Sequence, residues 1–175
     1  MLTADGIEKV VRTEPSSASG AFREVWFIGD VVVKRDGNRG ETNRGEAQNY
    51  ERFKAREGVY YREVPQFIAW HNGAPKDRYG PNKRRAYNIR FPKMFMIGDY
   101  LVAERVKFPH PCADHREKYG FRCGNPVNCA ECRASEDIQE IMSEEFGIGD
   151  MHGGNFCYDA ETNTAYIVDI QDIGW

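Results

Sequence analysis

The segment from residue 147 to residue 169 constrains the fold of this 175-residue chain more than any other stretch. It follows an apolar helix pattern and begins as a glycine-rich loop that contains Asp150 and Asn155. It continues as two short strand patterns, at 156–158 and at 165–169, the second of which ends at Asp169. If these strands form a hairpin, the three oxygen-bearing side chains lie at the same end of it.

Three such side chains at one hairpin end have a recognisable chemistry. Hard cations such as Mg²⁺ bind through carboxylate and amide oxygens together with the phosphates of a substrate. A carboxylate can also orient and deprotonate an attacking hydroxyl. Since positioning and charge neutralisation account for nearly all of the catalysis in phosphoryl transfer, this segment indicates a site for a metal ion and a phosphate-bearing ligand.

The rest of the chain mixes strand and helix patterns. Apolar runs on either side of a Gly-Asp dipeptide predict hairpins at 25–34 and at 93–106. Helices are predicted at 7–12, at 41–56 and after Ser135, which has the properties of an N-cap. Because hairpins give antiparallel strands and the helices are interspersed among them, we predict an α+β fold.

The central part of the chain is more polar. A strand is predicted at 64–70, whereas 71–90 and 109–133 have the composition of irregular segments. The run 83–85 makes the first of these segments basic. A basic loop can contact nucleic acid or a phosphorylated partner, but solvated charge is the commoner outcome, so we do not expect nucleic-acid binding.

Composition and charge narrow the classes of function. Hydrophobic residues make up 41% of the chain and charged residues 29%, as in globular proteins. No apolar run approaches the roughly 18 residues of a membrane span, and no signal peptide is visible, so we expect a cytoplasmic protein without a membrane partner. The net charge of −3 divides into +8 for residues 34–93 and −9 for residues 94–175. Such halves could attract phosphates, hold metal ions or associate with each other, or they could be two solvated faces.

The run Gly149-Asp150-Met151-His152-Gly153-Gly154-Asn155 resembles the catalytic loop of the protein-kinase-like superfamily. The step of five residues from Asp150 to Asn155 matches that loop. The histidine at the third place of the Asp-Met-His run is similar to the aminoglycoside and choline kinase branch. The resemblance implies that Asp150 is the catalytic base and that Asn155 is a magnesium ligand.

Two upstream segments resemble further parts of the same family, in the same order. Residues 19–26, which include Gly20, resemble a degenerate glycine-rich phosphate loop. Lys34 resembles the strand lysine that binds the phosphates, and Glu46 on the next helix resembles the glutamate that pairs with that lysine. The resemblance therefore implies that these residues bind the nucleotide.

A third segment resembles the strand that leads into the adenine-binding hinge. It covers residues 100–106 and implies that Glu104 and Val106 contact the nucleotide. The implied fold is bilobal, with a kinase-like N-lobe at 1–106 that contains an antiparallel sheet. The minimal C-lobe would cover 107–175.

The second magnesium ligand of the family has two candidates within the metal-binding loop at 147–172. Asp172-Ile173-Gly174 copies the family triplet Asp-Phe-Gly more closely. Asp169 copies the spacing more closely, because it lies 14 residues after Asn155 and ends an apolar strand. We favour Asp169, with Asp172 as the alternative.

Four of the five cysteines lie within 21 residues: Cys112, Cys123, Cys129 and Cys132. The last two form a Cys-x-x-Cys pair, a spacing that lets two thiolates chelate one ion. We expect a zinc knuckle with a structural Zn²⁺ in the insertion at 110–133, with His110 and His115 as reserve ligands. A reduced loop and a redox pair are the alternatives. Cys157 lies in a strand pattern and is expected to be a buried apolar side chain.

Together the resemblances imply a phosphotransferase that uses ATP and Mg²⁺ to phosphorylate a protein or a small hydroxylated acceptor. The chain ends six residues after Asp169, whereas a protein kinase continues with the helices that bind its acceptor. The alternative is therefore a pseudokinase that binds and regulates a partner protein. A truncated kinase of this kind would suit a compact viral or phage genome, and an oligomer is left open.

Overall fold

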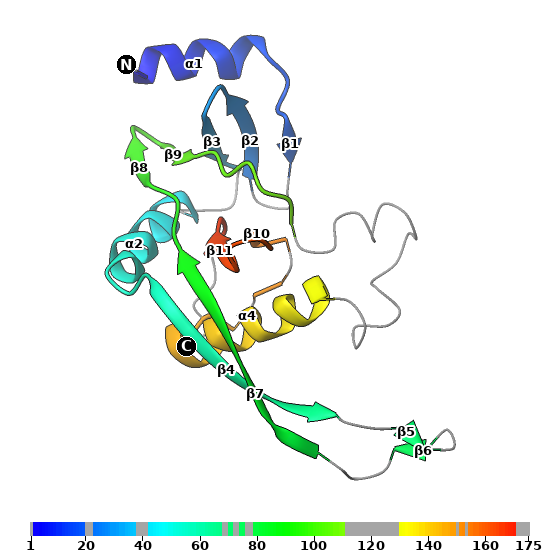
Figure 1. Cartoon of the computed structure of the whole chain (residues 1–175). Coiled ribbons are helices and arrows are strands. Elements are labelled where there is room, and N and C mark those ends of the chain that lie inside the picture. The colour runs from blue at the N-terminus through cyan, green and yellow to red at the C-terminus, as the bar shows by residue number, and fades with distance from the viewer. Residues whose placement is uncertain are drawn as a thin grey trace.

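The computed structural model describes residues 2–19, 23–37, 42–67, 70–71, 74–75, 79–110, 130–149, 151–152 and 154–170. Within these ranges the chain has three helices and two main sheets (Figure 1). A short hairpin of β5 (Trp70–His71) and β6 (Ala74–Pro75) forms a further, two-stranded sheet. The predicted α+β class is confirmed. None of the described helices combines the length and the apolar composition needed to cross a membrane.

The first main sheet has five strands in the order β1-β2-β3-β9-β8, and every neighbouring pair is antiparallel. Its strands are β1 (Ala18–Ser19), β2 (Arg23–Ile28), β3 (Val31–Asp36), β8 (Met94–Ile97) and β9 (Tyr100–Glu104). Gly29 and Gly98 turn the two predicted hairpins, each with a φ of 60°. Glycine adopts this left-handed conformation without steric cost. Strands β2 and β3 pair antiparallel, as do β8 and β9, so both hairpin predictions are confirmed.

Helix α1 (Ala4–Thr13) covers one face of this sheet. Its buried Ile7 belongs to a cluster with Trp26 and Val33 of the sheet. Because successive side chains of a strand point to opposite faces, Lys34 points to the other face of the sheet. Helix α2 (Thr42–Lys54) meets the sheet there.

Helix α2 is held against the end of β3 by its first residues. The backbone N–H of Asn43 donates to both carboxylate oxygens of Asp36, each at 3.1 Å. A carboxylate at a helix N-terminus satisfies N–H groups that have no partner within the helix. Tyr50 and Phe53 are buried together with Glu46, so the helix presents this carboxylate and these rings to the interior.

The second main sheet has four strands in the order β10-β11-β7-β4. Its strands are β4 (Gly58–Phe67), β7 (Tyr79–Arg90), β10 (Phe156–Asp159) and β11 (Thr164–Ile167). Only β7 and β11 pair in parallel within this described sheet. The long β4–β7 ribbon extends away from the rest of the chain in Figure 1. The sheet joins strands from both sides of the predicted lobe boundary at residue 106, and that boundary stays a prediction.

The prediction of an irregular segment at 71–90 is wrong for β7. Tyr87 and Ile89 are buried on one face of the strand, while Arg84 and Arg90 on the other face are exposed. Arg85 forms an ion pair with Asp137 of a helix, at 2.9 Å. A strand this polar is stable because β4 and β11 satisfy its backbone and a distant carboxylate satisfies its arginine.

Helix α4 (Ala130–Phe146) carries the apolar face predicted for it. Ile138, Ile141, Met142 and Phe146 are all buried. The helix begins five residues before Ser135, so the prediction of an N-cap at Ser135 is wrong. Residues 130–133 are helical rather than irregular, because nothing in their sequence interrupts a helix.

One apolar cluster joins α2 and α4 to both main sheets. It contains Phe53 of α2, Met142 of α4 and Ile167 of β11, and it extends to Leu101 of β9. This core holds α2 and the end of β11 close to β9, and β3 is attached to β9 by strand pairing. The candidate site lies where β3, α2 and the end of β11 meet.

Candidate functional site

A buried ion pair joins β3 to α2. The Nζ atom of Lys34 lies 2.7 Å from Oε1 of Glu46. Glu46 is completely buried and Lys34 is 7% exposed. Removing two charges from water costs on the order of several kcal/mol per ion unless close pairing and hydrogen bonds offset that cost. The pair therefore has to be held in a closely satisfied geometry.

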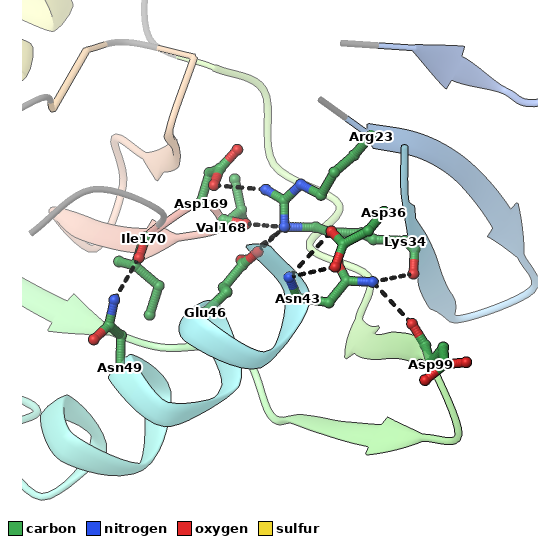
Figure 2. A network of polar contacts seen from close by, with 10 residues as sticks. All are labelled: Arg23, Lys34, Asp36, Asn43, Glu46, Asn49, Asp99, Val168, Asp169 and Ile170. Atoms are coloured by element: carbon green, nitrogen blue, oxygen red, sulfur yellow. Dashed lines mark hydrogen bonds and ion pairs between the residues drawn. The ribbon is translucent and has the colours of Figure 1, made fainter. Parts of the chain in front are cut away.

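Arg23, at the start of β2, supplies a second cation. Its guanidinium pairs with the other carboxylate oxygen of Glu46. Its Nη2 atom also donates to Oδ1 of Asp169, at 2.8 Å. Figure 2 shows the guanidinium between these two acids. Arg23 thus links the buried glutamate to an aspartate that lies 146 residues further along the chain.

Lys34 closes the same set of contacts from the other side. Its Nζ atom donates to the carbonyl oxygen of Val168, at 2.9 Å. The strand lysine therefore touches both the helix glutamate and the residue next to Asp169. We call Arg23, Lys34, Glu46 and Asp169 the charge network. It contains two cations and two carboxylates, so the formal charges of its four side chains cancel.

The end of the β10–β11 hairpin brings Asn155 beside Asp169. The carbonyl oxygen of Asn155 accepts hydrogen bonds from the backbone N–H groups of Val168, at 2.9 Å, and Asp169, at 3.1 Å. The Asn155 backbone N–H in turn donates to the carbonyl oxygen of His152, at 2.8 Å. The glycine-rich loop and the end of the returning strand are thus joined through their backbones.

The environment of Asp169 acts on its ionisation. Burial raises the pKa of the Asp169 carboxyl above its usual range, and the charge of Glu46 acts in the same direction. The positive charges of Lys34 and Arg23 oppose this rise in pKa. Asp169 therefore depends on nearby cations to remain ionised.

The donor atoms at this end of the hairpin suit a hard cation. The side chain of Asp169 is 31% exposed, and Asn155 beside it is half-buried. Both side chains carry oxygen donors, which is the ligand type that Mg²⁺ prefers. Lys34 adds a positive charge in contact with the same segment, as a phosphate-binding group requires.

Asn43 braces the lysine strand. Its Nδ2 donates to the carbonyl oxygens of Lys34, at 3.0 Å, and Asp99, at 3.1 Å (Figure 2). The residue is completely buried, and its Oδ1 has no hydrogen-bond partner among the described residues. Asn43 therefore ties α2, β3 and the β8–β9 turn together immediately next to Lys34.

Sequence reasoning missed three of the residues that build this site. Asn49 of α2 donates through Nδ2 to the carbonyl oxygen of Ile170, at 2.8 Å, and so holds the residue after Asp169. Like Arg23 and Asn43, it contacts a segment that is distant in the sequence. For Arg23 there was one signal: it is a cation within the stretch expected to bind phosphates, and a guanidinium pairs well with a phosphate group.

The predicted hinge residues Glu104 and Val106 line a cavity of about 780 Å³. Phe91, Phe108 and Tyr166 also line it, and the rings of Phe108 and Tyr166 stack with centroids 5.4 Å apart. None of the four side chains of the charge network lines this cavity. The structure thus brings Lys34, Glu46, Asn155 and Asp169 together and places Glu104 and Val106 beside a different space.

Several predicted site residues lie outside the described residues: Gly20, Asp150, Asp172, Cys112, Cys123, Cys129 and His115. Of the other zinc candidates, Cys132 is half-buried in α4. Nδ1 of His110 lies 2.8 Å from the carbonyl oxygen of Phe156. In the part of the chain that the structure describes, no three His, Cys, Asp or Glu residues form a group that could hold a metal ion.

Cys157 behaves as the sequence predicts. It lies in β10 and is 6% exposed. Burial raises the pKa of its thiol to about 11, so the thiol stays protonated at neutral pH. The prediction of a buried apolar side chain is confirmed.

Comparisons with protein-family models, with curated proteins and with solved structures found no match for this chain.

Proposed function

We propose that the chain is a protein-kinase-like phosphotransferase that uses ATP and Mg²⁺. The observation that carries this proposal is the buried pair between Lys34 and Glu46 in contact with the segment that ends at Asp169. In protein kinases a strand lysine pairs with a helix glutamate, and both this pair and a metal-binding aspartate must be in place for activity. The same three residue types meet here from distant parts of the chain.

The roles follow from the chemistry of each group. Lys34 would bind the phosphates, and Glu46 would hold its ammonium group in position. Asn155 and Asp169 would hold Mg²⁺, which supplies neutralisation of the phosphate charge. Asp150 would orient the acceptor hydroxyl and take its proton. The acceptor would be a protein or a small hydroxylated molecule, bound between lobes that divide near residue 106.

We also propose a structural Zn²⁺ held by Cys112, Cys123, Cys129 and Cys132. The Cys-x-x-Cys spacing supports it, because two thiolates at this spacing chelate one tetrahedral ion. Metal analysis of the freshly purified protein tests the proposal, and a zinc content near zero would refute it.

Nucleotide binding and transfer are tested separately. ATP with Mg²⁺ should raise the melting temperature of the wild-type protein, and radiolabelled phosphate should appear on the protein itself or on an added acceptor. Lys34→Met and Asp169→Asn should lose both effects, because each removes a group that binds the phosphates or the metal ion. Arg35→Gln is the matched control, since Arg35 pairs with Glu24 away from the charge network. Absence of both a melting shift and transfer in the wild-type protein would refute the proposal.

A pseudokinase that binds and regulates a partner protein is the second candidate function. It is supported by Arg23, which already pairs with both Glu46 and Asp169. A charge network that is neutral in itself gives a stable core without a bound metal ion. A melting shift with nucleotide but no transfer to any acceptor would favour this candidate.

A further inference from the structure

Arg23 is the member of the charge network to which the proposed function assigns no role. Its guanidinium is 5% exposed and lies between two carboxylates. The side chain begins at the first residue of β2, directly after residues 20–22 of the predicted phosphate loop. Because the guanidinium is in contact with Asp169, a ligand that binds this carboxylate would also come close to Arg23.

The two contacts of Arg23 differ in their access to solvent. Glu46 is completely buried and also pairs with Lys34, so it can anchor the guanidinium in place. The side chain of Asp169 is 31% exposed, so this end of the contact can be reached from outside. Arg23 can therefore release Asp169 without losing Glu46.

A divalent cation at Asp169 would compete with the guanidinium. Nη2 of Arg23 lies 2.8 Å from Oδ1 of Asp169, and a metal ion bound to the same carboxylate would place like charges close together. The planar guanidinium fork matches a phosphate group as well as it matches a carboxylate. A bound phosphate therefore offers Arg23 a replacement for the contact that it would lose.

We propose that Arg23 is an internal counter-cation that the metal ion displaces from Asp169 and that the phosphates of the nucleotide then bind. The proposal rests on the proposed function, because it assumes that this site takes a metal ion and a nucleotide. It makes Arg23 a nucleotide-binding residue. The two ligands then assist each other, since the phosphates draw away the cation that competes with the metal, and by linkage the effect is reciprocal.

The proposal gives opposite signs for the two ligands measured alone. In Arg23→Gln, Mn²⁺ alone should bind more tightly, by about tenfold, because its competitor is gone. ADP in the presence of EDTA should bind less tightly, by a similar factor, because one phosphate-binding group is gone. If the role of Arg23 were purely structural, Arg23→Gln should bind both ligands less tightly, because loss of the guanidinium would loosen the whole site.

The experiment measures Mn²⁺ binding from the electron paramagnetic resonance signal of the free ion, and ADP binding by calorimetry. Arg23→Lys keeps the positive charge and loses the fork, so its Mn²⁺ affinity should stay near that of the wild type. Arg35→Gln removes the same charge from the neighbouring residue of Lys34 and should change neither affinity.

The outcomes separate the two proposals. If wild-type protein binds both ligands but Arg23→Gln binds Mn²⁺ no more tightly, the role of Arg23 is refuted and the proposed function stands. If the wild type binds neither Mn²⁺ nor ADP, the proposed function fails and the role of Arg23 fails with it. If Arg23→Gln does not fold, the Nε–H resonance of Arg23 in the wild-type protein provides the test. This resonance is identified by its loss in Arg23→Lys, and it should shift when ADP and Mg²⁺ are added. An unchanged resonance would refute the role of Arg23.

Discussion

Glu46 carries a charge at a position with no access to solvent. A carboxylate there is tolerated because each of its oxygens has its own cation, Lys34 on one side and Arg23 on the other. Breaking a buried pair leaves an uncompensated charge, which is more costly than never having buried the pair. The stability of the site therefore depends on this single residue more than on either cation.

Glu46→Gln should lower the free energy of unfolding by about 3 kcal/mol, because two buried cations would then share only Asp169. Urea unfolding followed by circular dichroism measures the change. Glu24→Gln is the control: Glu24 pairs with Arg35 while both side chains are 41% exposed, and such a pair contributes about 1 kcal/mol or less. Equal losses in the two variants would show that burial of the charge network does not matter for stability.

At the scale of elements, α4 is held to β7 by a buried carboxylate. Asp137 of α4 accepts hydrogen bonds from the hydroxyl of Tyr87, at 2.6 Å, and from Arg85, at 2.9 Å. Burial, together with this carboxylate, raises the pKa of Tyr87. The phenol therefore stays protonated and keeps donating its hydrogen bond at neutral pH and well into the alkaline range.

Asp137→Ala should destabilise the protein by roughly 2–3 kcal/mol, because it leaves a buried hydroxyl and a guanidinium without their shared acceptor. The midpoint of urea denaturation reports the change. Glu136→Ala, at the exposed neighbouring position of the same helix, should shift the midpoint little. If the two variants were equally stable, the contact between α4 and β7 would have to rest on apolar packing alone.

The elements that could be predicted are those with local signals. Gly29 and Gly98 mark their hairpins within four residues of sequence, because the turn requires a left-handed backbone there. Strand β7 could not be predicted, since its arginine is stabilised by Asp137, which lies 52 residues away. Ser135 misled the prediction of α4 because a capping residue can also lie inside a helix whose earlier residues are good helix formers.

The same distinction applies to the site. Lys34, Glu46 and Asp169 were found because each follows a local pattern that resembles a known family. Arg23 and Asn43 contact residues that are distant in the sequence, and no local pattern identifies such contacts. The charge network as a whole therefore required the folded chain.

At the scale of the whole molecule, the opposite charges of the two halves of the sequence meet within one chain. Arg62 on β4 pairs with Glu140 and with Glu144 of α4, the latter at 2.6 Å. Arg56 lies 3.7 Å from Glu145 in the same helix. Part of the excess positive charge of residues 34–93 is thus neutralised by the acidic helix, rather than by a separate partner.

This pairing predicts a salt dependence of stability. The carboxylates that pair with Arg62 are 55% and 62% exposed, so dissolved ions can screen them. Raising NaCl from 50 mM to 500 mM, a range over which the Debye length falls from roughly 14 Å to 4 Å, should lower the melting temperature of the wild-type protein. Arg62→Ala should be less stable at low salt by about 1 kcal/mol and should respond less to added salt, because its pairs are already absent.

Lys93→Ala is the control for this prediction. Lys93 is exposed, and its substitution removes the same charge from the same half of the sequence without touching α4. If both variants and the wild type responded to salt alike, the meeting of the two halves would contribute nothing to stability, and their opposite charges would be two solvated faces.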